Sequence, residues 1–182
     1  MSFLAAYGLL AHALIFGAIA ALLPLGILRP KAALAATTLS LLVGIAPGLH
    51  GIFGTPSVTL LQLALLQLAN KTPSPFSVRP AIGVLIFAMM FYAAAWGLGP
   101  FDPYSLGFQP WTILMAMLPM AAAMAWRKMH SGLLILAVDL AAYSTGIFPN
   151  LWDVLIDPLL ALLACSMVAR QAYLRFSARG NR

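Results

Sequence analysis

The side chains that could act as acids, bases or metal ligands are few, and most of them fall in short segments between apolar runs. The sequence holds four acidic residues, all aspartates, and three histidines. One histidine and three aspartates lie in the segments GLHGIFGTPS, GPFDPYSLGFQP and FPNLWDVLIDP; they are His50, Asp102, Asp153 and Asp157. An imidazole with three carboxylates could bind a metal ion, or act as a base with orienting acids. If the protein is an enzyme, we expect its catalytic residues among these four.

The spacing of these four residues matches no known catalytic motif. A second interpretation is therefore open, in which Asp102 and Asp153 cap turns and His50 lies in the lipid headgroup region. Asp157 is the strongest candidate for a site, because it lies inside an apolar run and the following Pro158 stands at a natural helix start.

His50 lies in the glycine-rich segment 48–57, which is predicted to be a loop. Within it, Thr55 is expected to cap the next helix, and Pro56 then occupies the first helical position. Turn formation alone accounts for most of this segment. The histidine is the residue that it leaves unexplained.

Asp139 is the other exceptional residue, because it lies in the middle of the apolar stretch LLILAVDLAAY. A charge at the centre of a membrane helix costs about 2.5–3.5 kcal/mol on insertion scales, so this carboxyl should be protonated or should face polar partners. The sequence predicts an intramembrane polar site around it, with the candidate members His12, Ser40, Gln62, Gln67 and Tyr92. Both a functional acid and a protonated aspartate that holds helices together fit this position.

The composition places these residues in a membrane. Of the 182 residues, 63% are hydrophobic and 8% are charged, whereas soluble proteins have roughly 45–50% apolar and about 25% charged residues. With a mean hydropathy of +0.97, the chain is predicted to be an all-α, polytopic membrane helix bundle. The net charge of +6 does not indicate nucleic-acid binding, because the basic residues lie in short clusters between apolar runs.

Seven apolar runs could supply the helices that position the candidate residues. They are residues 3–28, 32–49, 55–69, 81–98, 111–126, 132–148 and 154–174. The third run is short, and Thr59, Gln62, Gln67 and Asn70 would form a polar stripe along one face of it. It could therefore cross the membrane with this stripe toward the bundle, or lie on the membrane surface.

The basic residues favour a crossing for the third run. If it crosses, all ten lysines and arginines lie on one side of the membrane, which the positive-inside rule assigns to the cytoplasm. Asp102 and Asp153 then lie on the opposite side. We therefore expect seven transmembrane helices, with the N-terminus outside and the C-terminus inside. Residues 1–174 would form a single transmembrane domain, and residues 175–182 a basic cytoplasmic tail that is frayed.

No residue pattern identifies a cofactor or a metal. Cys165 stands alone in an apolar run, so the sequence offers neither a disulfide framework nor a cysteine-based metal site. His12, His50 and His130 are too scattered to supply the paired ligands of a haem. The cofactor is left unassigned.

Three segments resemble stretches that occur, in the same order, in small uncharacterised inner-membrane proteins of Gram-negative bacteria. They carry the patterns G-x-F-G-x-x-S at 51–57, F-D-P-Y at 101–104 and N-L-W-D-x-L-x-D-P at 150–158. The resemblance covers most of the chain and implies a multi-pass protein of the inner membrane, in which these segments form one outward-facing unit. It implies no activity. Where that group would carry an acidic residue and leucine, this chain has Thr55 and Pro56, which argues against a metal site in this segment.

Three classes of function fit these features. The first and preferred one is an accessory subunit or carrier in cell-envelope assembly or transport of lipids or lipid-linked glycans. In that role Asp139 and the Gln62/Gln67 stripe would form a polar path or a partner interface. The second is an enzyme at the periplasmic surface that acts on a lipid or lipid-linked substrate, with His50 as base. The third is a substrate-binding membrane subunit of a transporter.

The expected partners follow from the same features. The lipid bilayer is the first of them. A larger membrane protein would be the partner of an accessory or binding subunit, and a lipid-linked substrate would be the ligand of an enzyme. No nucleic acid is expected.

Overall fold

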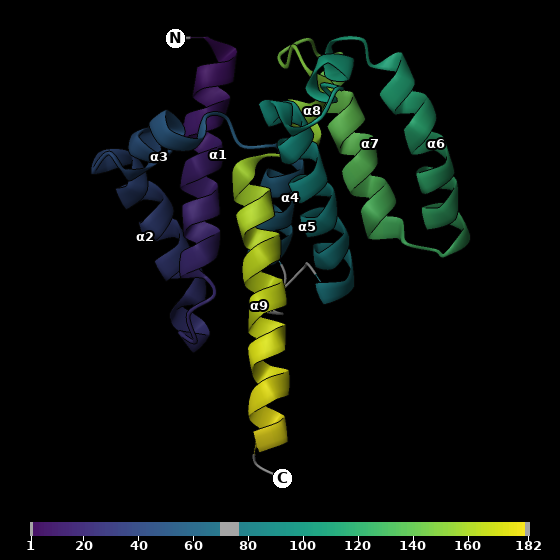
Figure 1. Ribbon diagram of the computed structural model, residues 1–182. Coiled ribbons are helices and arrows are strands. Elements are labelled where there is room, and N and C mark those ends of the chain that lie inside the picture. The colour runs from purple at the N-terminus through teal and green to yellow at the C-terminus, as the bar shows by residue number, and fades with distance from the viewer. Residues whose placement is uncertain (1, 70–76, 181–182) are drawn as a thin grey trace.

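Helices make up all the regular secondary structure in the part of the chain that the computed structural model describes, residues 2–69 and 77–180 (Figure 1). The α-helices are α1 (Phe3–Ala20), α2 (Arg29–Leu42), α3 (Ile45–Phe53), α4 (Val58–Ala69), α5 (Val78–Ala93), α6 (Trp111–Trp126), α7 (His130–Ser144), α8 (Leu151–Leu155) and α9 (Pro158–Gly180). Shorter helical turns are η1 (Gly26–Leu28), η2 (Ala94–Leu98) and η3 (Tyr104–Phe108). The predicted all-α fold is confirmed by these elements.

Three helical segments are long and apolar enough to cross a membrane. They are α1, Val78–Leu98 (α5 with η2) and Leu151–Ser177 (α8 with most of α9). The pair Gly26–Leu42 and α3 would make a fourth if it is one span, although the two helices are bent by 72° where they meet. The helices α4, α6 and α7 are apolar but shorter. By length and composition this set of helices is compatible with a membrane protein.

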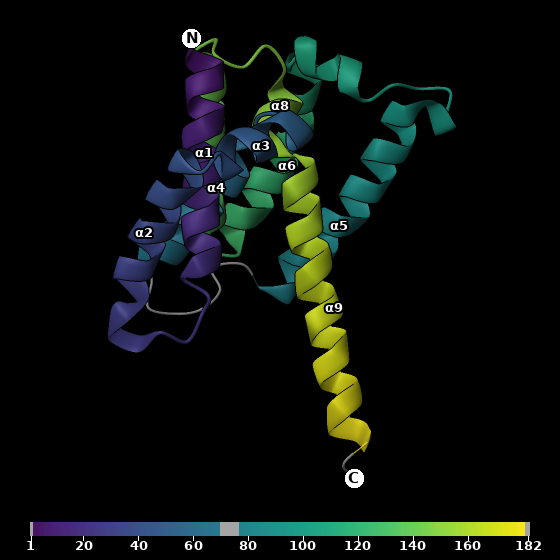
Figure 2. The ribbon, with the colours of Figure 1, turned by 90° about the vertical axis from the view of Figure 1, so that its left-hand side faces the viewer.

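The helices α1, α2, α4, α5, α6, α7 and α9 run in alternating directions, whereas α3 lies across the bundle, and most connections gather at two opposite ends (Figures 1 and 2). One end holds the C-terminus, the α1–α2 connection, the start of α5 and the α6–α7 connection. The other end holds the N-terminus, the α5–α6 connection and the α7–α8 connection. The described basic residues fall in the elements of the first end or in the half of α9 that points to it: Arg29, Lys31, Arg79, Arg127, Lys128, Arg170 and Arg175.

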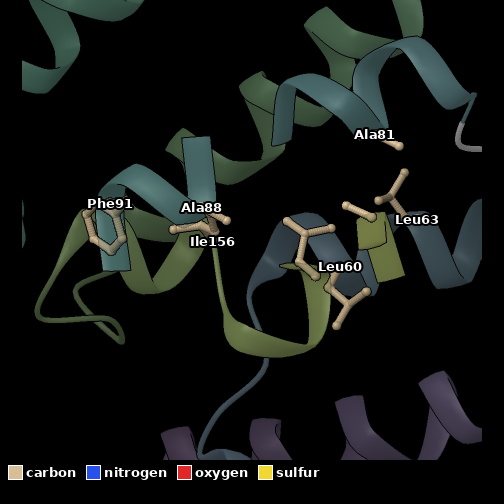
Figure 3. Packing of buried hydrophobic residues seen from close by; sticks show 8 residues of the cluster. Leu60, Leu63, Ala81, Ala88, Phe91 and Ile156 are labelled. Carbon is tan, nitrogen blue, oxygen red and sulfur yellow. The ribbon is translucent and has the colours of Figure 1, made fainter. Parts of the chain in front are cut away.

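α4, which corresponds to the third apolar run, is an interior helix. It contacts α1, α7, α8 and α9. Its residues Leu60 and Leu63 belong to the larger buried apolar cluster, which joins α4 to α5 and to the start of α9. Figure 3 shows Ala81 beside Leu63, and Ala88 beside Ile156. α4 is therefore packed among the other helices of the bundle.

The predicted loop at residues 48–57 is wrong for most of its length. Helix α3 continues through it to Phe53, and only residues 54–57 are non-helical. Two glycines set the limits of this helix. Gly44 precedes it with φ +80° at the bend from α2, and Gly54 ends it with φ +74°, a backbone region that side chains with a Cβ atom rarely adopt.

The cap of α4 also differs from the prediction. The helix begins at Val58, and the backbone N–H of Leu60 donates to Ser57 Oγ over 3.2 Å. Ser57 is therefore the capping residue, two positions after the predicted Thr55. The shift follows from α3, because a longer α3 moves the turn toward the C-terminus.

The start of α9 is confirmed and its end is later than predicted. The helix begins at Pro158, and the backbone N–H of Leu160 donates to Asp157 Oδ1 over 2.9 Å. It then continues without interruption to Gly180. Residues 175–180 therefore belong to this helix.

Some of the predicted features lie outside the described residues. They include most of the proline-rich connection KTPSPFSVRP, together with Asn70, Lys71 and Arg182. The end of that connection is described, and it forms the first turn of α5, which includes Pro80.

Candidate functional site

Asp139 is buried inside the bundle and is hydrogen-bonded to α4. Only 2% of the residue is exposed. The hydroxyl of Thr59 donates to Oδ2 over 2.7 Å, and the side-chain amide of Gln62 donates to Oδ1 over 2.8 Å. Residues three apart share one face of a helix. Each carboxyl oxygen therefore receives one donor, and both donors come from the polar face of α4.

The surrounding atoms can hold this carboxyl with or without its proton. The amide nitrogen of Gln62 also lies 3.1 Å from the carbonyl oxygen of Ile135, so each of its two hydrogens has an acceptor. The Thr59 hydroxyl has a second acceptor as well, the carbonyl oxygen of Val154 at 3.4 Å. A protonated Asp139 could donate to Thr59, whose hydrogen would then turn to Val154. Rotation of one hydroxyl thus accommodates the gain or loss of a proton.

The carbonyl of Val154 is available because the helix breaks just after it. α8 ends at Leu155, and the backbone of Ile156 is extended. In a continuous helix this carbonyl would accept a hydrogen bond from the residue four positions later, but Pro158 has no N–H. Broken membrane helices commonly place free carbonyls at proton and ion sites. The break between α8 and α9 therefore contributes directly to the Asp139 cluster.

Sequence reasoning named Gln62 as a partner of Asp139 but not Thr59. The signal was present, since Thr59 belongs to the same polar stripe of the third run as Gln62. Two other proposed partners have different contacts. His12 Nε2 lies 2.9 Å from the carbonyl oxygen of Gly54, and the hydroxyl of Ser40 donates within its own helix.

Gln67 belongs to the stripe but not to the Asp139 cluster. Its side-chain amide donates to the carbonyl oxygen of Ala18 over 3.0 Å, and the backbone carbonyl oxygen of Gln67 accepts from the guanidinium of Arg29 over 2.7 Å. These bonds tie the end of α4 to the end of α1 and the start of α2. The polar stripe thus binds α4 to neighbours along its whole length.

Two helix starts meet through buried polar side chains at the beginning of α4. Ser57 is 0% and Asp157 is 5% exposed. The hydroxyl of Ser57 donates to Asp157 Oδ1 over 3.2 Å, while each of these residues also accepts a backbone N–H of the helix that it caps. The N-terminus of a helix favours negative charge. The aspartate is therefore held by neutral donors and a helix dipole.

A cavity of about 310 Å³ lies next to this junction, and its lining includes Leu4, close to the N-terminus. We call it the outer cavity. The acids that line it are Asp153 and Asp157, and six aromatic residues complete much of its wall: Phe53, Phe91, Tyr92, Tyr104, Phe148 and Trp152. In the described part of the chain, no lysine, arginine or histidine lines it. Tyr92, predicted to belong to the Asp139 site, belongs to this wall.

The three segments identified from the sequence patterns meet at the outer cavity. Gly54 and Thr55 come from the first, Tyr104 from the second, and Trp152 to Pro158 contribute from the third. Residues about 100 positions apart are thereby brought to one place. The expectation that these segments form one unit agrees with this arrangement.

Hydrogen bonds between η3 and α8 hold the wall of the outer cavity. The phenol of Tyr104 donates to Asp153 Oδ1 over 2.9 Å, and the indole N–H of Trp152 donates to the carbonyl oxygen of Pro103 over 2.8 Å. The fully buried amide of Asn150 donates to the carbonyl oxygen of Tyr104 over 3.1 Å. Burial and the hydrogen bond to Asp153 raise the pKa of Tyr104 to about 12, so its hydroxyl is a donor at neutral pH.

His50 lies outside the outer cavity and pairs with His12. The two rings are 5.8 Å apart, and His50 Nδ1 lies 3.0 Å from the carbonyl oxygen of Gly54, which His12 also contacts. Because a carbonyl oxygen only accepts, both imidazoles must donate to it. Nδ1 of His12 is then a buried acceptor without a hydrogen-bond partner.

Asp102 is exposed and caps a turn, which is the role that the second interpretation of the sequence gave it. Its Oδ1 accepts the backbone N–H of Tyr104 over 2.9 Å. Of the four candidate catalytic residues, the structure therefore brings Asp153 and Asp157 to one cavity and leaves His50 and Asp102 outside it. Within the described residues, no group of three or more His, Cys, Asp or Glu side chains could hold a metal ion.

A second cavity, of about 370 Å³, lies between α1, α4 and α9. Its lining is almost entirely apolar, with Gln67 and Ser166 as the polar members. Pro158 lines the outer cavity, and the next residue of α9, Leu159, lines the second. We call it the apolar cavity.

Comparisons of the chain with protein-family models, with curated proteins and with solved structures found no match.

Proposed function

We propose that the protein is a carrier of the bacterial inner membrane, in which Asp139 takes up and releases a proton as the carrier works. The observation that carries this proposal is the buried carboxyl itself, bonded to Thr59 and Gln62 beside the free carbonyl of Val154. An acidic side chain buried in a membrane is energetically costly, and such residues usually mark functional sites. Its donors can serve both protonation states, which a purely structural hydrogen bond does not require.

We further propose that the chain crosses the membrane seven times, with its N-terminus outside and its C-terminus in the cytoplasm. The alternating helix directions support this topology, as do the basic residues gathered toward one end (Figure 1). In the cytoplasm-facing position those residues satisfy the positive-inside rule. The outer cavity then opens to the periplasm, where material for envelope assembly would enter or leave.

A carrier is favoured over an accessory subunit that uses the polar stripe as its partner interface. The stripe faces inward, because Thr59 and Gln62 bond to α7 and Gln67 bonds to α1. A partner would have to separate these helices to reach it. An inward-facing stripe is the arrangement expected of a polar path.

Transient charge movement after a pH jump tests the proposal without knowledge of the cargo. The purified protein is reconstituted in liposomes on a solid-supported membrane, and the external pH is stepped. Protonation of Asp139 displaces charge inside the membrane, so the wild type should give a transient current that Asp139→Asn abolishes. Asp102→Asn is the matched control, because Asp102 is exposed, and it should keep the current. Equal currents in the wild type and Asp139→Asn would exclude the proposal.

An enzyme at the outer cavity is the second candidate, because Asp153 and Asp157 share that cavity. Such an enzyme would work without His50 and Asp102, which lie outside it. Incubation of the protein with a lipid extract of its native membrane discriminates between the two functions. A change in the lipid profile that Asp153→Asn prevents would favour the enzyme, and an unchanged profile favours the carrier.

A further inference from the structure

We propose that the outer cavity binds an organic ammonium group, carried either by a small free amine or by a lipid headgroup. This names a substrate class for the proposed carrier, so its meaning for transport rests on the proposed function. Binding itself does not, and it can be measured with no gradient across the membrane. The charge, the aromatic wall and the dimensions of the cavity lead to this ligand.

The charge of the cavity calls for a cation. Its two carboxylates have only neutral hydrogen-bond donors, which are the phenol of Tyr104 for Asp153 and the hydroxyl of Ser57 and the N–H of Leu160 for Asp157. Among the described residues, no basic side chain lines the cavity. Asp157 is buried and Asp153 is half-buried, and a carboxylate in such a place carries a desolvation cost that a bound cation offsets. An anionic ligand would meet repulsion from both of them.

The aromatic wall favours an organic cation over a metal ion. The rings of Phe91 and Trp152 are 4.9 Å apart, and those of Phe91 and Tyr92 are 5.3 Å apart. All three line the same cavity as the two carboxylates. Faces of such rings attract ammonium groups, and aromatic cages are a common means of binding quaternary ammonium ligands. A small metal ion would instead need several oxygen or nitrogen ligands.

This wall is already in place before any ligand binds. The indole N–H of Trp152 is held by Pro103 and the phenol of Tyr104 by Asp153. Fixed rings do not lose freedom when a ligand arrives, which favours affinity. The cavity volume of about 310 Å³ is at the small end of ligand pockets, which span roughly 300–1,000 Å³, and it suits a headgroup or a small amine.

The neighbouring apolar cavity distinguishes the two sources of the ammonium group. A lipid with its headgroup in the outer cavity would extend an acyl chain toward the apolar cavity, whose lining includes Leu159, the residue that follows Pro158 of the outer cavity. A free amine would occupy the outer cavity alone. Both sources share the same recognition chemistry at Asp153 and Asp157.

Choline and its uncharged carbon isostere, 3,3-dimethylbutan-1-ol, test the proposal with the full-length protein in phosphatidylglycerol nanodiscs. The two molecules have the same shape and differ in charge. Calorimetric titration should show choline binding at least about tenfold more tightly than the isostere. Equal affinity, or no binding of choline, would overturn the proposal, and this comparison needs no variant.

Variants then assign the effect to the two carboxylates. Asp153→Asn and Asp157→Asn keep an oxygen that can accept the existing hydrogen bonds, remove the negative charge and replace the other oxygen by an amide NH2 of similar size. Each should weaken choline binding about tenfold and leave binding of the isostere unchanged. Asp102→Asn should alter neither, since Asp102 does not line the cavity. Unchanged choline affinity in both cavity variants would also overturn the proposal.

Two further experiments distinguish a lipid headgroup from a free amine, and the ammonium site from proton exchange at Asp139. If a lipid headgroup is the occupant, phosphatidylethanolamine in the nanodisc should compete with choline, whereas a free-amine site should bind choline equally in both lipids. Asp139→Asn should bind choline as the wild type does, even though it loses the pH-jump current. Binding without a current would thus retain the ammonium site and reject proton coupling, and a current without binding would do the reverse.

Discussion

At the scale of single residues, the four aspartates have four different environments. Asp102 is exposed, Asp153 is held by a phenol, Asp157 caps a helix, and Asp139 is bonded by two side chains of α4. The exceptional position of Asp139 is readable from the sequence, because an acid in a long apolar run stands out. Its partners are not, because they depend on the rotation of α4 and on the break at Pro158.

Thr59→Val should destabilise the protein by about 1–2 kcal/mol, because Oδ2 of Asp139 would be buried without its donor. Thr59→Ser keeps the hydroxyl and should lose only a small part of that stability. Unfolding of the purified variants in detergent, monitored by circular dichroism, measures both. The hydrogen bond has no stabilising role if valine and serine have the same effect.

Tyr104 should make the stability of the outer end sensitive to alkaline pH. Its pKa is raised to about 12 from the ordinary value of 10.0, so the folded protein favours the neutral phenol. That contribution is fully present below pH 10.0 and is lost as the pH rises toward 12. The stability difference between the wild type and Tyr104→Phe should therefore shrink over this interval. If the stability difference between the wild type and Tyr104→Phe stays constant between pH 10 and pH 12, the pKa of Tyr104 is not raised in the folded protein.

At the scale of elements, the departures from the prediction are breaks and bends within apolar runs. Hydropathy alone read residues 32–49 as one span, whereas the chain bends by 72° before α3. The bend depends on Gly44, and a glycine in an apolar run does not by itself reveal a positive φ. The start of α9 was predictable, because Asp-Pro is a strong local signal for a helix start.

Close packing of α1 against α2 should depend on Gly17. A Cβ atom at this position would contact Thr37 Oγ1 and would lie 2.9 Å from the backbone oxygen of Ala33. Gly17→Ala should therefore destabilise the protein by about 1–3 kcal/mol. Gly83→Ala is the matched control, because Gly83 lies in a helix with open space around it, and it should be neutral or stabilising by about 0.5–1 kcal/mol. Thermal unfolding in detergent compares the two variants. If both change the stability by the same amount, close packing of α1 against α2 does not depend on Gly17.

At the scale of the whole molecule, the sequence predicts the helical fold and the grouping of segments 51–57, 101–104 and 150–158 better than it predicts the residues that line the outer cavity. Composition and periodicity indicate an all-helical membrane chain because each apolar run is a local feature. The outer cavity joins Gly54, Tyr104 and Trp152, which are far apart in the sequence. Its shape depends on how six helical elements pack, so no local pattern could specify which acids would line it.

Proton exchange at Asp139 is the central claim of the proposed function, and infrared difference spectroscopy of the protein in nanodiscs tests it most directly. The chain has four acidic side chains and no glutamate, so few side-chain carboxyl bands overlap. As the pH is lowered stepwise, the account predicts the growth of a carboxylic-acid carbonyl band that is missing in Asp139→Asn and retained in Asp102→Asn. An identical set of bands in the wild type and Asp139→Asn would contradict it.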